Sequence, residues 1–226
     1  MSTLQEEKSL RDEIVLIAHR MDSYGLNHGT SGNISVRVTG GMLITPSSIP
    51  AIEIKPFDII KIDSDGRCIN NSCQQQLNQP SSEWKLHSKI FERRQEVNAI
   101  IHCHSVNATA LACHAKSIPS FHYMTAVGGG HNIRCAEYAT FGSSELSEHA
   151  IKALENRFVC LLAQHGQVTI EKNLEKALKL AIEVENLSNI YIKACILGEP
   201  KLISKAEMSK VLTKFKSLNY LNQEIV

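Results

Sequence analysis

The stretch Ala99-Ile100-Ile101-His102-Cys103-His104-Ser105 is a short apolar run that ends in two histidines and a serine. Residues 99–103 have the length and composition of a buried β-strand, and Ser105 is suited to cap a helix that continues to about residue 114. Side chains alternate between the two faces of a strand, so His102 and His104 are predicted to project to one side. Cys103 is predicted to point the other way, into the core.

Helices and strands are expected on both sides of this stretch. Helical spacing of apolar residues, together with capping residues, predicts helices over about residues 4–24, 80–94, 143–156, 173–198 and 204–215. Alternation and β-forming residues predict strands over residues 33–38, 42–45, 57–62 and 158–163, whereas residues 117–142 are expected to be irregular. Because the strands lack a regular strand–helix–strand alternation, we expect a mixed or antiparallel sheet with helices on its faces.

Composition and charge exclude several classes of protein. The chain has 226 residues, is 43% hydrophobic and 21% charged, and carries a net charge of +1, so we expect one domain over residues 1–226. Its basic residues are scattered, which argues against a nucleic-acid partner, and no apolar run approaches the ~18 residues of a membrane span. The start lacks the pattern of a signal peptide and the seven cysteines are odd in number, so we expect reduced thiols in a cytoplasmic protein.

Three histidines and one glutamate form a candidate metal site. His102 and His104 stand at the end of one apolar strand, and His165 follows another, directly before a glycine. Zinc is bound by imidazole nitrogens at ~2.0–2.1 Å, and three protein ligands with an open position are typical of a catalytic site. Glu83 is predicted in the first turn of a helix. There it could serve as a ligand, as a general acid or base, or only as a charge that stabilises the helix N-terminus.

Three serine- and glycine-rich segments are candidate phosphate-binding loops, although each alone also fits an ordinary cap or turn. Ser81 and Ser82 open a predicted helix, where backbone N–H groups and the helix dipole favour an anion. Residues 29–33, Gly-Thr-Ser-Gly-Asn, form a loop whose glycines let the backbone approach an anion closely. The third segment is Thr-Pro-Ser-Ser at residues 45–48. Beside a metal site, the three segments indicate a phosphorylated substrate.

Further motifs join these over most of the chain, from about residue 25 to 215. They are Gly29-Thr30 with Gly32-Asn33, Met42-Leu43-Ile44-Thr45-Pro46, Pro80-Ser81-Ser82-Glu83-Trp84, His102-Cys103-His104, Ile118-Pro119 with His122-Tyr123-Met124, Tyr138-Ala139-Thr140-Phe141-Gly142, and Asn173-Leu174-Glu175-Lys176-Ala177. In these motifs the chain resembles the class II aldolase/adducin family, and within it the branch that cleaves L-fuculose 1-phosphate.

The resemblance implies a fold, an assembly and a set of site residues. The fold would be α/β with three layers, α/β/α, around a mainly antiparallel sheet. The assembly would be a homotetramer of fourfold cyclic symmetry with active sites at subunit interfaces. One Zn²⁺ per subunit would be bound by Glu83, His102, His104 and His165, although imidazole ligands also accept Mn²⁺ or Co²⁺. The implied phosphate-binding positions are Gly32, Asn33, Ser47, Ser48, Ser81 and Ser82.

The implied reaction is the cleavage of a ketose 1-phosphate, either L-fuculose 1-phosphate or a related sugar phosphate. The products would be dihydroxyacetone phosphate and an aldehyde such as L-lactaldehyde. The metal would act as a Lewis acid, and Glu83, with a raised pKa, would move a proton to and from carbon. Tyr123, reaching in from a neighbouring subunit, would donate a proton to the aldehyde oxygen.

Two departures from the family pattern bear on the substrate. Ser48 stands where the family has a glycine in its second phosphate loop, and Leu218 stands where a second catalytic tyrosine is expected. Tyr220 would replace that tyrosine through a shift in register. Otherwise the aldehyde end of the pocket, and with it the substrate or the stereochemistry, would differ.

Other functions on the same scaffold stay open. One is a sugar-phosphate 4-epimerase, but such epimerases carry aspartate where this chain has Glu83, which favours the aldolase. Another is a dehydratase that acts on methylthioribulose 1-phosphate. A non-catalytic, adducin-like interaction module is the alternative outside enzymes. Such modules lose the metal ligands, all of which this chain retains, so metal content would discriminate between the two.

Overall fold

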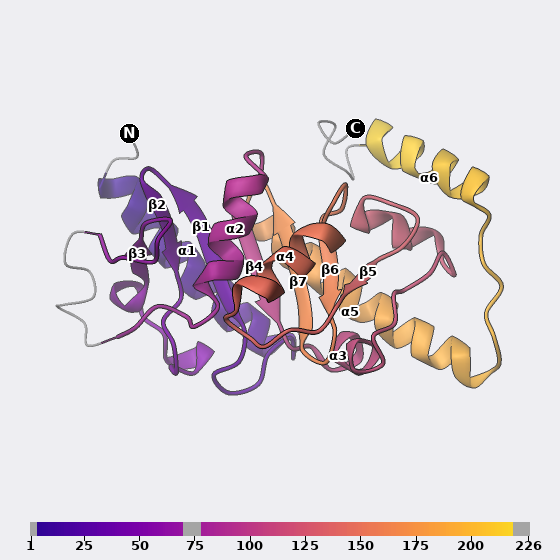
Figure 1. Cartoon of the computed structure of the whole chain (residues 1–226), viewed down its shortest axis with the longest axis horizontal. Coiled ribbons are helices and arrows are strands. Elements are labelled where there is room, and N and C mark those ends of the chain that lie inside the picture. Colours follow the sequence, from indigo (N-terminus) through magenta and orange to yellow (C-terminus); the bar gives the residue numbers. More distant parts are fainter. Residues whose placement is uncertain (1–3, 70–77, 219–226) are drawn as a thin grey trace.

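The computed structural model describes residues 4–69 and 78–218 (Figure 1). In this part of the chain the strands are β1 (Asn33–Val38), β2 (Gly41–Ile44), β3 (Ile60–Ile62), β4 (Ala99–Cys103), β5 (Arg134–Ala136), β6 (Val159–Leu162) and β7 (Gly166–Glu171). The α-helices are α1 (Leu4–Ser23), α2 (Trp84–Arg93), α3 (Val106–Cys113), α4 (Ser144–Ala153), α5 (Leu174–Ile196) and α6 (Lys205–Ser217). Short 3-10 helices are η1 (Ala51–Glu53), η2 (Pro56–Asp58) and η3 (Tyr123–Gly128).

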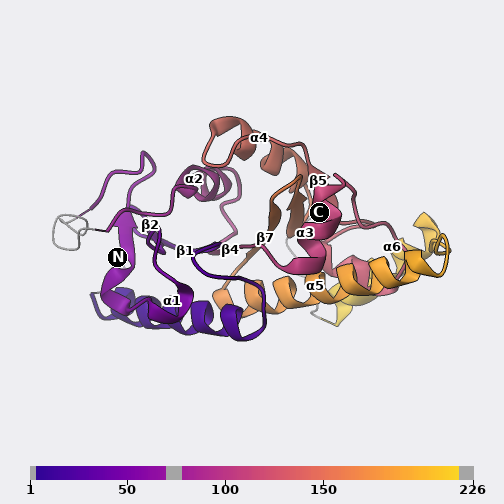
Figure 2. The ribbon, with the colours of Figure 1, turned by 90° about the horizontal axis from the view of Figure 1, so that it is seen from below.

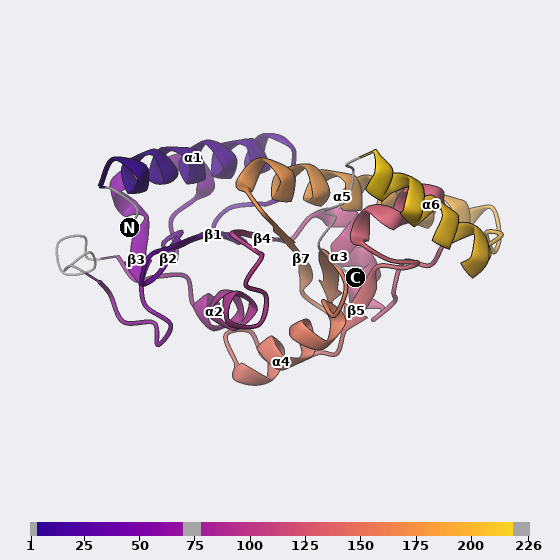
Figure 3. The same ribbon diagram turned by 90° about the horizontal axis from the view of Figure 1, so that it is seen from above.

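The strands form one sheet in the order β3-β2-β1-β4-β7-β6-β5. Neighbouring strands run antiparallel except for β5 and β6, which are parallel. Helices α1 and α5 cover one face of the sheet and α2 and α4 cover the other (Figures 2 and 3). The predicted three-layer fold with a mainly antiparallel sheet is therefore confirmed.

The central strand β4 contributes side chains to both faces of the sheet. Ile101 and Cys103 belong to the apolar cluster that includes α1 and α5, which confirms the inward direction predicted for Cys103. Ile100 belongs to the cluster on the other face, which includes α2 and α4. Because side chains alternate along a strand, His102 shares the face of Ile100 and therefore faces the layer of α2.

The predicted strand over residues 57–62 is shorter in the structure, where β3 comprises only Ile60–Ile62. The residues before it form η2, which begins at Pro56. The Asp58 carboxylate accepts the Lys55 backbone N–H at 2.8 Å and closes this turn. Proline fixes the backbone angle that starts a helical turn and has no N–H for a sheet, so the local chemistry overrides the apolar pattern.

Strands β5 and β7 were not predicted. In β7 the reason is that buried polar residues interrupt the apolar pattern of a strand. This strand contains the polar residues Gln167 and Thr169, both fully buried. The Gln167 amide donates to the Ala181 carbonyl at 3.2 Å, and the Thr169 hydroxyl donates to the Ala177 carbonyl at 3.1 Å. These two carbonyls belong to α5, so the buried amide N–H group and hydroxyl donate to an element that follows the strand in the chain.

Two helix starts also differ from the prediction. Helix α2 begins at Trp84 and is preceded by a turn at Ser82 and Glu83, whereas Pro80 forms an isolated β-bridge with Pro46. Ser105 is the N-cap residue of α3, but its side chain makes no capping hydrogen bond. Instead, the Glu185 carboxylate of α5 accepts the Asn107 and Ala108 backbone N–H groups, each at 2.9 Å.

The cysteines and the helices bear on the remaining expectations. Among residues 4–69 and 78–218 the free thiols are Cys103, Cys113, Cys135, Cys160 and Cys195. Cys68 is disulfide-bonded, so the prediction of reduced thiols is wrong at Cys68. Within the described ranges no helix combines the length and the hydrophobicity that a membrane crossing requires.

Candidate active site

His102 is positioned by the register of the three central strands. Its Cα pairs with that of Asn33 on β1 and with that of Val168 on β7. The side chain is fully buried, and Nδ1 donates to the backbone carbonyl of Gln167 at 2.9 Å. The other ring nitrogen, Nε2, is therefore left to face the site, as is typical of histidines that bind metals.

His165 enters the site from the hairpin that joins β6 and β7. Gln164, directly before it, has a left-handed backbone with φ of 51°. Gly166, directly after it, pairs so closely with the end of β4 that a Cβ atom there would lie 2.4 Å from the Cys103 carbonyl oxygen. A larger residue would push the hairpin away from β4, so Gly166 allows His165 to reach His102 and His104.

Glu83 is the N-cap residue of α2 rather than a residue of its first turn. Its side chain makes no capping hydrogen bond and turns toward the histidines, so the reading of Glu83 as a charge that only stabilises the helix is not supported. Oε2 lies 3.1 Å from Nε2 of His102 and accepts the side-chain amide N–H of Asn33 at 3.0 Å. Oε1 lies 3.4 Å from Nε2 of His165.

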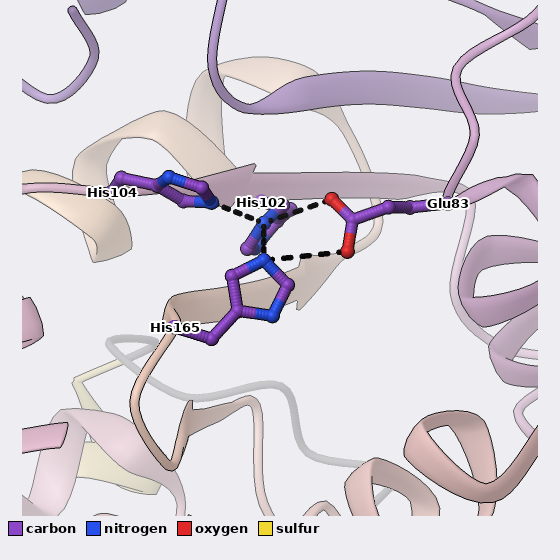
Figure 4. Close-up of side chains that lie close together, drawn as sticks. All are labelled: Glu83, His102, His104 and His165. Carbon is purple, nitrogen blue, oxygen red and sulfur yellow. Dashed lines mark hydrogen bonds and ion pairs between the residues drawn. The ribbon is translucent and has the colours of Figure 1, made fainter. Parts of the chain in front are cut away.

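The four predicted metal ligands converge (Figure 4). One ligand atom from each of Glu83, His102, His104 and His165 lies within 4.8 Å of all the others. Nε2 of His102 is 2.9 Å from Nε2 of His104 and 3.2 Å from Nε2 of His165. Nitrogen ligands that surround one zinc ion at ~2.0–2.1 Å lie roughly 3 Å from one another. The spacing therefore fits a single divalent cation.

A buried carboxylate oxygen and two neutral imidazole rings in the cluster also fit a cation. The Oε1 atom of Glu83 is buried without a hydrogen-bond partner among the described residues. Burial, together with the positive charge of His102, lowers the pKa of His104 to about 3 and that of His165 to about 4. Both rings are thus neutral near pH 7, the form that binds metals.

The pKa of Glu83 departs from the expectation. Burial alone would raise this pKa, but the charge of His102 and hydrogen bonds from His102 and Asn33 outweigh burial and bring the pKa below its usual range. Burial likewise lowers the pKa of His102, and the charge of Glu83 more than offsets it, so the net shift is upward. The shift of the Glu83 pKa is therefore downward, opposite to the raised pKa predicted for this residue, because the histidines stabilise the carboxylate.

A pocket of about 330 Å³ opens beside this cluster. Lys and Arg are absent from its lining residues in the described part of the chain. Its lining includes Glu83, His104 and His165 and all six predicted phosphate-binding residues, namely Gly32, Asn33, Ser47, Ser48, Ser81 and Ser82. An anion in this pocket would depend on hydroxyl groups, backbone N–H groups and the N-terminus of α2 rather than on a basic side chain.

Two backbone hydrogen bonds bring the serine segments together. Ser47 N–H donates to the Gln79 carbonyl at 2.8 Å, and Ser81 N–H donates to the Thr45 carbonyl at 3.1 Å. Ser48 lies in the left-handed region with φ of 65°, which explains why a glycine suits this position. Ser81 is buried, and its hydroxyl accepts the Glu83 backbone N–H at 3.3 Å.

Gly32 has a structural reason to be glycine. Its φ is +76°, and a Cβ atom there would lie 2.4 Å from the side-chain amide of Asn27. Asn27 is buried, and its Oδ1 accepts the His104 backbone N–H at 3.2 Å. The loop that precedes β1 thus supports a predicted metal ligand. No motif in the sequence assigned this role to Asn27.

Two aromatic residues of the pocket were not assigned a role from the sequence. Tyr138 and Phe141 line it and are 60% and 64% exposed. They lie in a segment predicted to be irregular. A Cβ atom on Gly142 would lie 2.8 Å from the Ser82 carbonyl oxygen, so this segment packs closely on the turn that contains Ser82. Two aromatic residues close to a glycine, in a segment predicted to be irregular, are the sequence signal that could have identified them.

The predicted catalytic tyrosine lies elsewhere. Tyr123, in η3, does not line the pocket and is 50% exposed. Its ring contacts that of Phe215 of α6 edge-on, with 6.2 Å between centroids. A role for Tyr123 therefore requires a neighbouring subunit and stays a prediction. Leu218 is the half-exposed C-cap residue of α6, and Tyr220 lies outside the described residues.

Comparison with known proteins finds that the chain is similar to class II aldolases. Residues 12–192 match the family model of the class II aldolase and adducin N-terminal domain. A "5-methylthioribulose-1-phosphate/5-deoxyribulose-1-phosphate aldolase" of Rhodospirillum rubrum is 44% identical over 209 residues, which is 92% of each chain. An "L-fuculose phosphate aldolase" of Escherichia coli K12 is 43% identical over 213 residues, 94% of this chain and 96% of that one.

The structural comparison agrees with the sequence comparison. A solved structure described as "L-fuculose 1-phosphate aldolase" superimposes with a TM-score of 0.87 at 38% sequence identity. The match covers 96% of this chain and 98% of that chain. The aligned region thus extends over nearly the whole of both proteins.

Proposed function

This chain belongs to the class II aldolase and adducin family, and from that premise we propose that it is a metal-dependent aldolase that cleaves a ketose 1-phosphate. The products would be dihydroxyacetone phosphate and an aldehyde. The proposal includes one divalent cation per subunit, Zn²⁺ in the first instance. It also includes a homotetramer, in which Tyr123 reaches the pocket of a neighbouring subunit.

One observation carries the proposal. The ligand atoms of Glu83, His102, His104 and His165 lie within 4.8 Å of one another beside a pocket that the serine-rich turns also line. This arrangement offers a cation site and an anion site in one cavity of about 330 Å³. A ketose 1-phosphate has both matching groups, a carbonyl for the cation and a phosphate for the turns.

The residues of the chain would divide the work of binding. Hydroxyl and backbone N–H groups of the serine turns would hold the phosphate at the N-terminus of α2. This contact is remote from the bond that breaks, so its binding energy serves to orient the reacting carbons. His102, His104 and His165 would hold the cation. When bound, this cation supplies Lewis-acid stabilisation of the negative charge that develops as the carbon–carbon bond breaks.

Two side chains would move protons. In cleavage, the C4 hydroxyl loses its proton as the C3–C4 bond breaks, and C3 of the dihydroxyacetone phosphate half gains one. The Glu83 carboxylate stands beside the cation cluster, and after taking up a proton from solvent it would deliver that proton to C3. Tyr123 from a neighbouring subunit would accept the proton of the C4 hydroxyl and pass its own phenol proton to solvent. Both residues would act in reverse order during condensation.

Three substrates are favoured by specific relatives. The relative from E. coli indicates L-fuculose 1-phosphate, and the one from R. rubrum indicates 5-deoxyribulose 1-phosphate and its methylthio derivative. All of these share the dihydroxyacetone phosphate half and end in a methyl group at the other. The exposed rings of Tyr138 and Phe141 on the pocket wall suit such an apolar end.

The test is the release of dihydroxyacetone phosphate from these three compounds, with and without a chelator. We expect release that the chelator abolishes and that added Zn²⁺ restores. The relative rates would identify the preferred aldehyde end. Failure of the metal-loaded protein to release dihydroxyacetone phosphate from any of them would reject the proposal. Mass spectrometry of the same reactions would then detect the loss of water that a dehydratase causes. Chromatography would detect the epimer that an epimerase forms.

A further inference from the structure

A buried histidine lies behind Glu83 and takes no part in the reaction described above. His87, on α2, is fully buried together with Ser35 of β1. Nδ1 of His87 lies 2.6 Å from the Ser35 hydroxyl oxygen, and Nε2 makes a short hydrogen bond with Oδ1 of Asn33. The amide nitrogen of Asn33 in turn donates to Oε2 of Glu83 at 3.0 Å. The four side chains form one continuous chain of hydrogen bonds.

The chemistry of the groups fixes the direction of every bond in this chain. The side-chain nitrogen of Asn33 lies 3.0 Å from Oε2 of Glu83, and only the NH₂ group of an amide can donate to a carboxylate oxygen. The Asn33 oxygen therefore faces His87 and also only accepts, which requires a proton on Nε2. Burial lowers the pKa of His87 to about 3, so the ring is neutral and Nδ1 carries a lone pair. The Ser35 hydroxyl must then donate to Nδ1.

We propose that His87 is a positioning residue for Glu83, because its Nε2–H holds the Asn33 amide in the one orientation that donates to the carboxylate. This inference rests on the proposed function. Without the N–H donor on His87, no group on the side away from Glu83 selects the oxygen end of the Asn33 amide over its nitrogen end. The flipped amide would set its oxygen against Oε2 of Glu83, two acceptors in contact, and would displace the carboxylate.

The proposal gives Asn33 a role that the family-like motif did not indicate. Asn33 lines the pocket together with the other predicted phosphate-binding residues, yet its side-chain amide donates a hydrogen bond to Glu83. The amide thus links the anion side of the pocket to the carboxylate. Positioning by such outer contacts typically changes activity by about ten- to a hundredfold.

A matched pair of substitutions tests this idea. In His87→Gln the amide nitrogen reaches the place of Nε2 and can still donate to Asn33. In His87→Asn the shorter side chain reaches only the place of Nδ1 and leaves Asn33 without its donor. Neither variant touches His102, His104 or His165. Ser88→Ala is the control on the same helix, because the Ser88 hydroxyl donates to the Ser64 carbonyl instead, at 2.9 Å.

The readouts are zinc content, kcat and KM for dihydroxyacetone phosphate release, and deuterium exchange into dihydroxyacetone phosphate in D₂O. We expect His87→Asn to keep its zinc and its KM while kcat and the exchange rate fall about ten- to a hundredfold. His87→Gln should stay within about threefold of wild type, as one preserved hydrogen bond allows. Equal losses in both variants, unchanged kcat in His87→Asn, or loss of zinc from it would overturn the proposal.

Two further measurements cover the remaining cases. If neither variant folds, Ser35→Ala removes only the hydroxyl that orients the ring, and kcat should fall about two- to tenfold. An unchanged kcat there would overturn the proposal. If the wild-type protein neither cleaves nor exchanges, the proposed function fails on its own. ¹⁵N NMR of the His87 ring then decides separately: a proton on Nε2 supports the hydrogen-bond chain, and a proton on Nδ1 contradicts it.

Discussion

Glu83 and His102 approach to 3.1 Å between Oε2 and Nε2, although one precedes helix α2 and the other belongs to strand β4. The contact exists because His102 faces the layer of α2 and because Glu83 turns away from its own helix. A carboxylate at this distance from the predicted metal ligands can serve both the cation and the substrate carbon.

For Glu83, the expected effect of Glu83→Gln is a loss of turnover without loss of metal. Three imidazole ligands remain, but the amide cannot take up or deliver a proton, so kcat should fall by about 10²- to 10⁴-fold. Zinc content and kcat would be measured on the same preparation. Glu92→Gln, an exposed carboxylate on α2, is the control and should keep full activity. Turnover near wild type in Glu83→Gln would exclude the proton-transfer role.

Removal of an imidazole should act on the metal itself. His165→Ala leaves two of the three ring nitrogens that converge at 2.9 and 3.2 Å, so we expect zinc to be lost on dialysis, with activity lost in parallel. Elemental analysis after dialysis is the measurement. His149→Ala, whose ring contacts the Glu137 carbonyl away from the pocket, should keep its zinc. Full zinc occupancy in purified His165→Ala would show that the ligand set is wrong.

Ser82→Ala should weaken binding of the phosphate more than it slows chemistry. The serine is exposed in the pocket at the N-terminus of α2, and hydrogen bonds to charged groups are strong. We therefore expect KM for the ketose 1-phosphate to rise about tenfold or more, with kcat little changed. Kinetics at saturating and limiting substrate separate the two effects. An unchanged KM would remove Ser82 from the phosphate site.

Ser48 gives a prediction about stability. Its φ of 65° is costly for a residue with a Cβ atom, so Ser48→Gly should raise the free energy of unfolding by up to about 1 kcal/mol. Ser47 is not among the residues with positive φ, and Ser47→Gly should lower it by about 0.5–1 kcal/mol. Urea denaturation of both variants is the measurement. A loss of stability in Ser48→Gly equal to that in Ser47→Gly would contradict the role of strain.

Part of the candidate site could be predicted from the sequence because local patterns carry it. The alternation of a short strand places His102 and His104 on one side and Cys103 on the other, whatever the rest of the fold. The types of side chain, imidazoles with a carboxylate and serine turns at a helix start, define a chemistry of cation and phosphate. The three-layer fold followed from the same patterns together with the family-like motifs.

Only the tertiary structure decided which of these groups meet. The contact of Glu83 with His102, the donation from Asn33 and the burial of His87 depend on strand register and on the packing of α2 against the sheet, which involve residues far apart in the chain. Strand β7 escaped prediction for the same reason, because Gln167 and Thr169 find their partners on α5. Local sequence sets the character of each group. Long-range packing, which no local pattern encodes, sets its neighbours and therefore its charge and its role.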